Sequence, residues 1–204
     1  MNPDPAELAA ASAHLAAGGV VALPTDTVPG LACLASSPAG VRAIFALKGR
    51  DEGKPLILFV ETLDGVARLA GGLAPRLRRL LERSWPGPLT AVLPLQGTWP
   101  PGVGRDGTAG YRIPDHPAVR ALLAAAGQPL ATTSANLAGQ PPLASAGDAA
   151  GLWGGRVRVV PGDGGGSTPS TVADCTTWPP RIIRAGAVSQ AALDDLVASS
   201  GPER

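Results

Sequence analysis

The residues best suited to chemistry in this sequence are cations, hydroxyls and amides that stand at predicted loop positions. Phosphate oxygens accept strong hydrogen bonds from Lys and Arg, so this combination fits a polyphosphate bound beside a small polar molecule. Phosphoryl or nucleotidyl transfer needs little covalent help from a protein, because positioning and charge neutralisation carry most of it. The cations are Lys48, Arg50, Lys54, Arg112 and Arg184, and the neutral groups are Thr25, Thr27, Ser134, Asn136, Ser170 and Thr171.

Other kinds of catalytic apparatus are missing from the sequence. It contains no G-x-x-x-x-G-K-[ST] loop, and its only histidines, His14 and His116, are expected to be structural or exposed. Cys33 and Cys175 lie far apart in apolar runs, so we expect buried, reduced thiols and no zinc site. The G-x-G-x-x-G at 102–107 follows prolines and precedes a predicted strand, which excludes a dinucleotide fingerprint. We predict no metal site built from protein side chains.

The two lysines are concentrated in one place. Of 17 basic residues only Lys48 and Lys54 are lysines, and with Arg50 they fall between a predicted helix and a predicted strand. Such a cluster favours a phosphate site, because a compact ammonium and a guanidinium both pair with phosphate. Cations at a helix end that only complement the helix dipole are the alternative.

Two polar loops must be positioned by predicted strands. Val20 to Leu23 is a short apolar run that predicts a buried strand, and it leads into Thr25, Asp26 and Thr27. Residues 128–131 lead in the same way into the run 132–136, TTSAN. Ligand sites in open α/β sheets lie beyond the carboxyl ends of strands, so both loops are expected to meet a ligand. An ordinary turn with a helix cap remains the alternative for the first loop.

The whole chain alternates predicted strands and helices without a repeat or a linker. We therefore predict one α/β domain over residues 1–204, with a mixed sheet because several connections are too short for crossover helices. Predicted helices cover residues 5–17, 38–48, 62–71, 74–83, 118–126, 145–152 and 189–198. Predicted strands cover residues 20–23, 31–35, 56–60, 89–95, 128–131, 157–160, 171–175 and 181–184, with one more ending near residue 114.

Composition limits the partners. The formal net charge of +1 gives no global electrostatic reason to bind nucleic acid or a membrane. The N-terminus has no signal-peptide pattern and no apolar run approaches the roughly 18 residues of a membrane span, so we expect a cytoplasmic protein without a membrane partner. The basic helix that carries Arg76, Arg78, Arg79 and Arg83 is either a solvated face or an RNA contact.

Seven short motifs, in order and over nearly the whole chain, resemble those of the YrdC/YciO family. The resemblance implies a single YrdC-like domain, a twisted mixed sheet flanked by helices, with its core motifs between residues 18 and 189. The motifs are PTDTVPGL (24–31), LKGRDEGKPL (47–56), WPGPLT (85–90), YRIPDHP (111–117), TSANLAGQP (133–141), STVADCT (170–176) and IIRAGAVS (182–189).

The resemblance also implies an activity, because the best characterised members of this family are threonylcarbamoyl-AMP synthases. These nucleotidyltransferases convert L-threonine, bicarbonate and ATP, with Mg²⁺ as cofactor, into threonylcarbamoyl-adenylate and pyrophosphate. The product is used to make threonylcarbamoyladenosine in tRNA, so a tRNA-modifying transferase complex is the implied partner, with a possible direct contact to tRNA or double-stranded RNA.

Site residues carry over position by position. The family's tetrad on the nucleotide phosphates matches Lys48, Arg50, Ser134 and Asn136, of which Lys48 and Arg50 are the implied catalytic residues. Lys54 and Arg184 match further positions of the ATP pocket. The positions implied to bind threonine are Thr25, Arg112, Ser170 and Thr171.

Two positions depart from the family pattern. Pro29 stands where the family usually has Tyr, and Phe59 stands where some members have His. They keep open a YciO-like paralogue that binds nucleotide but uses another acceptor. A second alternative, of a different class, is a protein that binds double-stranded RNA or tRNA through the basic helix.

Overall fold

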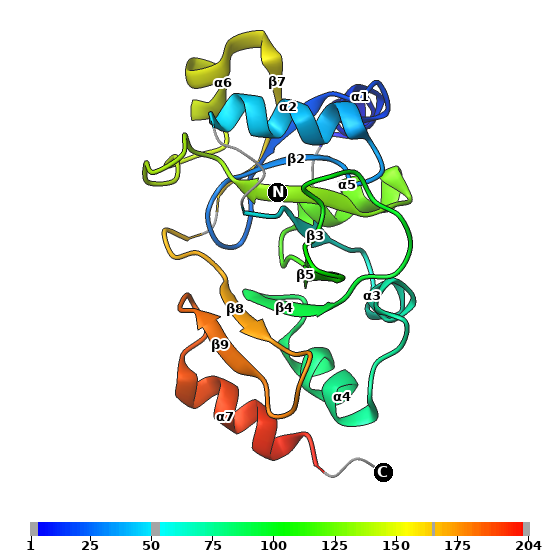
Figure 1. Cartoon of the computed structure of the whole chain (residues 1–204). Helices are drawn as coiled ribbons and strands as arrows, with labels where there is room; N and C mark the ends of the chain where they lie inside the picture. Colours follow the sequence, from blue (N-terminus) through cyan, green and yellow to red (C-terminus); the bar gives the residue numbers. More distant parts are fainter. Residues whose placement is uncertain (1–3, 50–53, 165, 202–204) are drawn as a thin grey trace.

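A single nine-stranded sheet runs through the computed structural model, which describes residues 4–49, 54–164 and 166–201 (Figure 1). Its strand order is β7-β1-β2-β6-β3-β5-β4-β8-β9, and it combines parallel pairs, such as β3 with β5, with antiparallel pairs, such as β2 with β6. The α/β class and the mixed sheet predicted from the sequence are confirmed. The strands are β1 (Val20–Leu23), β2 (Gly30–Leu34), β3 (Ile57–Phe59), β4 (Leu89–Pro94), β5 (Thr108–Arg112), β6 (Leu130–Ser134), β7 (Val157–Val159), β8 (Thr171–Asp174) and β9 (Arg181–Arg184).

The two faces of the sheet carry separate apolar clusters because strand side chains alternate between faces. In β1, Val20 and Ala22 belong to the larger cluster, while Val21 and Leu23 belong to the smaller one. The first face is covered by α2 (Pro38–Lys48), α3 (Leu63–Ala70), α4 (Pro75–Ser84), α6 (Asp148–Trp153) and α7 (Gln190–Ser199). The second face is covered by α1 (Pro5–Ala16) and α5 (Pro117–Ala126), at the end of the sheet near β1 (Figure 1).

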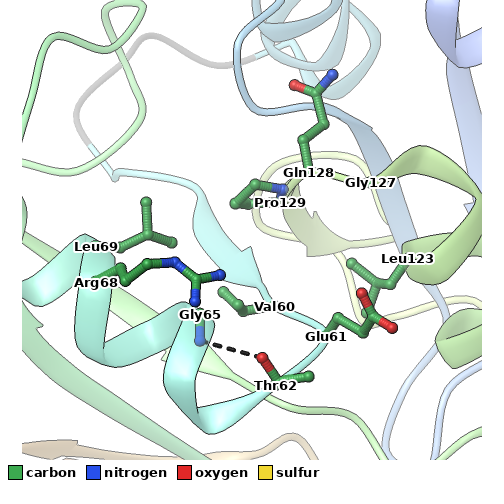
Figure 2. Close-up of a pocket in the computed structure, with 10 residues that line it drawn as sticks. All are labelled: Val60, Glu61, Thr62, Gly65, Arg68, Leu69, Leu123, Gly127, Gln128 and Pro129. Carbon is green, nitrogen blue, oxygen red and sulfur yellow. Dashed lines mark hydrogen bonds between the residues drawn. The ribbon is translucent and has the colours of Figure 1, made fainter.

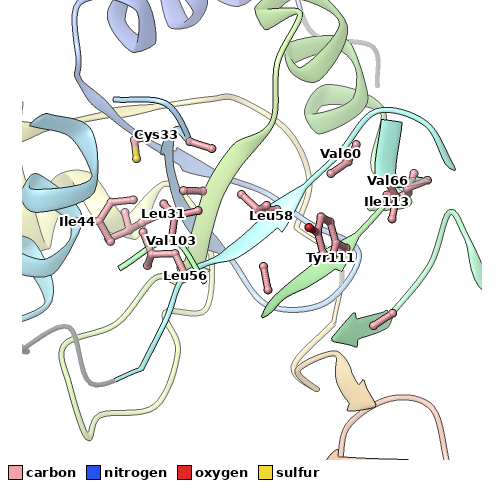
Figure 3. Packing of buried hydrophobic residues seen from close by; sticks show 14 of the residues in the cluster. Leu31, Cys33, Ile44, Leu56, Leu58, Val60, Val66, Val103, Tyr111 and Ile113 are labelled. Carbon is pink, nitrogen blue, oxygen red and sulfur yellow. The ribbon is translucent and has the colours of Figure 1, made fainter. Parts of the chain in front are cut away.

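The larger cluster extends along most of the sheet (Figure 3). Ile44 of α2 and Cys33 of β2 lie at one end of this view, and Tyr111 of β5 and Ile113 lie at the other. Tyr111 is fully buried, and its hydroxyl donates to the carbonyl oxygen of Pro94 at 2.9 Å. Burial also raises the pKa of this hydroxyl. The phenol is therefore a satisfied core group and not a candidate acid or base.

The ends of α2 are fixed by local sequence signals. Ser37 caps the first turn by accepting a hydrogen bond from the amide of Gly40 at 3.1 Å, and Pro38 occupies the first helical position. Gly49 ends the helix in the left-handed conformation at φ +61°, which an L side chain adopts only with strain. Lys48 is therefore the last helical residue, as the sequence predicted, and its side chain reaches the sheet.

Most element boundaries differ from the predictions by one to three residues, and the difference at β6 bears on the site. Strand β6 continues to Ser134, whereas the predicted strand ended at residue 131. The reason is tertiary: Thr132 pairs with β2 on one side and β3 on the other, so TTS completes two ladders instead of starting a loop. Helix α5 begins at Pro117, one residue earlier than predicted.

Within the described residues, no helix combines the length and apolar character that a membrane span requires.

Candidate functional site

Most of the predicted site residues that the structure describes gather on the second face of the sheet, beyond the part that α1 and α5 cover. Two connected chambers lie there, a large one of about 540 Å³ and a small one of about 100 Å³. Both chambers are lined by Ile57, Thr132, Thr133, Ser134 and Arg184. The large chamber adds Lys48, Lys54, Pro55, Asn136, Ala138 and Gly139, and the small one adds Thr25, Thr27, Val28, Gly30, Phe59, Arg112, Pro142, Pro169 and Ser170.

Lys48 anchors the large chamber although only 2% of the residue is exposed. Its Nζ donates to the carbonyl oxygens of Ser134 (2.6 Å) and Asn136 (2.8 Å) and to Oδ1 of Asn136 (2.9 Å). These three acceptors are neutral oxygens. They hold the ammonium at the wall of the large chamber, where it can meet an anion.

Asn136 is held in one orientation by its neighbours. Its Oδ1 accepts from Oγ of Ser134 (2.6 Å) and from Lys48, while its Nδ2 donates to the carbonyl oxygens of Leu137 (2.9 Å) and Gln140 (2.6 Å). The donors and acceptors of the amide are therefore assigned by its partners. Three members of the predicted phosphate tetrad, Lys48, Ser134 and Asn136, form one hydrogen-bonded unit. The fourth, Arg50, lies outside the described residues.

Arg112 holds the small chamber in a different way. Its Nε donates to the carbonyl oxygen of Gly87 (2.9 Å) and its Nη1 to Oγ1 of Thr27 (2.7 Å). Its Nη2 forms an ion pair with Oδ2 of Asp26 at 2.6 Å, a contact that is not aligned as a hydrogen bond. The Phe59 ring lies 5.6 Å from the guanidinium carbon. Arg112 is thus fixed to three different segments while only 2% exposed.

Burial and charge act in opposite directions on Arg112. Burial lowers the pKa of its guanidinium, and the Asp26 carboxylate opposes that shift. The reference pKa is so high that Arg112 stays protonated. The charge of Arg112 is therefore partly cancelled by Asp26.

Arg184 is the last residue of β9 and lines both chambers. Its Nη2 donates to the carbonyl oxygen of Ser170 (2.8 Å) and to Oγ of Ser170 (3.2 Å), and Oγ of Ser170 also bonds Oγ1 of Thr90 at 2.9 Å. Burial lowers the pKa of the Arg184 guanidinium. Arg184 and Ser170 both lie in the site, as predicted, and the oxygens of Ser170 orient the Arg184 guanidinium.

The structure does not bring Thr171 to the cavity. Thr171 is fully buried, its Oγ1 donates to the carbonyl oxygen of Val188 (2.7 Å), and the same oxygen accepts from the Val188 amide (2.9 Å). The implied threonine contact is therefore corrected to a role in fixing the chain that follows β9. Thr25 does line the small chamber, and its Oγ1 donates to the carbonyl oxygen of Val28 (2.8 Å). Lys54 is exposed and lines the large chamber.

Sequence reasoning placed Asp26 and Thr132 in polar loops expected to meet a ligand and marked Phe59 as a departure from the family pattern, but it assigned no individual role to any of the three. Asp26 pairs with Arg112, Phe59 lies against the same guanidinium, and Thr132 lines both chambers. Asp26 had a usable signal, since a carboxylate between two threonines after a strand invites a cationic partner. The contacts of Phe59 and Thr132 depend on how the strands pair, and strand pairing cannot be read from the sequence alone.

The lining offers little to a metal ion. No group of three or more His, Cys, Asp or Glu side chains that could hold a metal occurs in the described part of the chain. None of the described residues lining the two chambers is acidic. The nearby Asp26 carboxylate is already paired with Arg112. The donor set therefore suits anions and polar neutral groups.

A separate cavity of about 150 Å³ lies between α3 and the end of α5 (Figure 2). Its apolar lining includes Val60 and Leu123, and its charged groups are the exposed Glu61 and Arg68. Inside it, Thr62 caps α3 by accepting a hydrogen bond from the Gly65 amide at 3.1 Å. This cavity contains none of the predicted site residues, so a cavity by itself does not identify the functional site.

Comparison with known sequences matches most of the chain to one family. The Sua5/YciO/YrdC family model, described as telomere recombination, matches residues 13–186. A protein of Thiobacillus denitrificans named threonylcarbamoyl-AMP synthase is 38% identical over 175 residues, which cover 85% of this chain and 92% of the relative. A protein of Chromohalobacter salexigens with the same name is 40% identical over 169 residues, covering 82% of this chain and 91% of the relative.

Solved structures give the same result for the fold. The crystal structure of P. abyssi Sua5 complexed with L-threonine superposes with a TM-score of 0.85 at 32% identity, covering 93% of this chain and 56% of that one. The structure of E. coli YciO superposes with a TM-score of 0.79 at 25% identity, covering 92% of this chain and 94% of that one.

Proposed function

This chain belongs to the Sua5/YciO/YrdC family, and from that premise we propose that it is an L-threonylcarbamoyladenylate synthase. The proposed reaction consumes L-threonine, bicarbonate and ATP and releases pyrophosphate. The proposal includes a cytoplasmic enzyme of the nucleotidyltransferase class that supplies threonylcarbamoyl-adenylate to a transferase complex modifying tRNA. Two relatives that align over nearly their whole length carry the corresponding synthase name, and a similar structure is described with L-threonine bound.

The observation that carries the proposal is the pair of connected chambers with different chemistry. The large chamber, about 540 Å³, falls within the range of about 300 to 1,000 Å³ that small-molecule sites occupy. Lys48 and Lys54 give it positive charge suited to a triphosphate. The small chamber is lined by hydroxyls and by Arg112, which suits a small polar molecule with a carboxylate. The shared walls support this proposal, because ligands bound in the two chambers would be neighbours.

The adjacent chambers fit a reaction between two bound substrates. The threonine nitrogen is first joined to the bicarbonate carbon with loss of water, which gives N-carboxythreonine. A carboxylate oxygen of that group then attacks the α-phosphorus of ATP, and the bond from phosphorus to the bridging oxygen breaks, releasing pyrophosphate. Lys48 stabilises the negative charge that develops on the leaving group, and Ser134 and Asn136 keep its ammonium in place.

Mg²⁺ enters the proposal with ATP and not through protein ligands. Since the described lining residues of both chambers are neutral or cationic, the phosphate oxygens and water are the fitting ligands for Mg²⁺. When bound, the ion would neutralise phosphate charge. The chain's own contribution is to bind and orient the two substrates.

The experiment that tests the function is pyrophosphate release from ATP with bicarbonate, compared with L-threonine, L-serine and no amino acid. Release that depends on L-threonine is the expected result. ATP binding without threonine-dependent release would contradict the proposed synthase activity. It would favour the alternative of a YciO-like paralogue with another acceptor, and the structural similarity to E. coli YciO is consistent with that alternative.

A main role in binding double-stranded RNA through α4 receives less support. Arg78 pairs with Asp64 and with Glu82, Arg79 donates to the carbonyl oxygen of Ser200, and Arg76 lies over the Trp178 ring. Partners within the chain occupy three of the four arginines. Thermal stabilisation by tRNA, but not by L-threonine with ATP, would reverse this preference.

A further inference from the structure

The connection from β7 to β8 has to cross the sheet, because these strands stand first and eighth in the strand order (Figure 1). At its start, Val160 belongs to the small apolar cluster and its amide donates to the carbonyl oxygen of Ala22 at 2.9 Å. At its end, Pro169 and Ser170 line the small chamber. The position of Ser170 in the small chamber therefore depends on the course of this connection across the sheet.

His116 holds this connection near its start. The residue is 8% exposed, and its Nε2 lies 2.8 Å from the carbonyl oxygen of Asp163. A carbonyl oxygen only accepts, so Nε2 carries the hydrogen and donates it. The Nδ1 atom is buried and has no partner among the described residues. His116 also precedes α5 without capping it, so the bond to Asp163 is the one hydrogen bond of its ring in the described chain.

The held segment, residues 161–164, packs directly on the loop that carries Thr25 and Thr27. A Cβ added to Gly162 would lie 2.9 Å from Cγ of Pro24 and 3.2 Å from Cε1 of His116, and the φ of Gly162 is +152°. Glycine is required here for two reasons, the backbone conformation and the close approach. His116 and Pro24 thus meet at this glycine.

We propose that His116 is a positioning residue for the small chamber, because its hydrogen bond to Asp163 keeps residues 161–164 against Pro24. The bond sets the separation between Thr25 and Thr27 on one wall and Ser170 on the other. Arg112, four residues earlier in the chain, fixes the same loop through Thr27 and Asp26. The segment from Arg112 to His116 therefore holds this loop directly through Arg112 and indirectly through residues 161–164. The consequence for threonine binding rests on the proposed function.

The test compares two substitutions of similar size. His116→Leu removes the donor, whereas His116→Gln keeps an N–H at a similar reach. Loss of one hydrogen bond of ordinary strength corresponds to about a tenfold weaker interaction, so His116→Leu is expected to raise the KM for L-threonine about tenfold. The KM for ATP is expected to stay unchanged, and His116→Gln is expected to recover most of the loss.

A second variant approaches the same contact from the other side. Gly162→Ala keeps His116 but pushes the segment away from Pro24, so it is expected to raise the KM for L-threonine as well. In the double variant with His116→Leu, the two effects are expected not to add, because both break one contact. Gly164→Ala is the matched control, since a Cβ there meets open space.

Amide hydrogen exchange at Val160, whose amide donates to the carbonyl oxygen of Ala22 at the start of this connection, supplies a readout independent of activity when measured by mass spectrometry. Faster exchange in His116→Leu, recovered in His116→Gln, is the expected result. Unchanged exchange and an unchanged KM for L-threonine in His116→Leu would overturn the proposal, as would equal losses in both variants. If the wild-type protein shows no threonine-dependent release, the proposed function fails, and the exchange comparison still decides whether His116 holds the segment.

Discussion

Two buried cations, Lys48 in the large chamber and Arg112 in the small one, differ in the segments that hold them. Each is 2% exposed, and each makes several contacts with distant segments. Lys48 donates to oxygens of Ser134 and Asn136 at the wall of the large chamber, whereas Arg112 pairs with the Asp26 carboxylate and donates to Thr27. The comparison teaches that burial alone does not define a role, because Lys48 is held by the loop that follows β6 and Arg112 fixes the PTDT loop.

The largest effect is expected from Lys48→Met, which removes the buried ammonium at the wall of the large chamber. Pyrophosphate release is expected to fall by at least about 100-fold, because a buried donor aimed at developing negative charge has an effect of this order. Steady-state kinetics measure the change, and circular dichroism establishes that the variant is folded. Lys54→Met is the control, since Lys54 lines the same chamber but is exposed. Equal losses in both variants would remove the distinction between a built site and general positive charge.

Asp26→Asn tests the opposite half of the comparison. It keeps the shape of the side chain but leaves the Arg112 charge in a buried position without its counter-charge. The free energy of unfolding is expected to fall by about 1–3 kcal/mol, because an unpaired buried charge is costly and an amide oxygen replaces only part of the pair. Urea denaturation measures the loss. An unchanged midpoint would show that Asp26 does not compensate Arg112.

A smaller effect is expected from Ser170→Ala, which tests whether Arg184 contributes to both chambers. The substitution removes one hydroxyl partner of Arg184 and leaves the carbonyl partner, so Arg184 is loosened but not released. Because Arg184 lines both chambers, the KM values for ATP and L-threonine are both expected to rise, by about threefold to tenfold. A change confined to one substrate would assign Arg184 to one chamber.

The smallest effect concerns ionisable groups buried outside the site. Burial raises the pKa of the Cys33 and Cys175 thiols to about 12 from a reference of 9.0, so both are neutral at pH 8. Because the folded pKa exceeds the unfolded one, their contribution to stability is present below pH 9.0 and is lost as the pH rises towards about 12. The native protein is expected to resist alkylation at pH 8, with the urea-unfolded protein as control.

Much of the fold follows from local sequence signals. Ser37 and Pro38 start α2 and Gly49 ends it, and this is why the position of Lys48 at a helix end could be predicted. The alternation of strands with helices, and connections too short for crossovers, predicted the mixed sheet. Strand β6 shows the limit, because its last residues become strand only through partners on both sides.

The sequence by itself determined which residue types would bind: cations, hydroxyls and amides in seven motifs. Tertiary structure decided what each of them does. In the folded chain, Lys48 donates to oxygens of Ser134 and Asn136, and Arg112 pairs with the Asp26 carboxylate. Thr171 is buried away from the two chambers and donates to Val188. The physical reason is that a polar group acts through its partners and its burial, and both are set by segments tens of residues away in the chain.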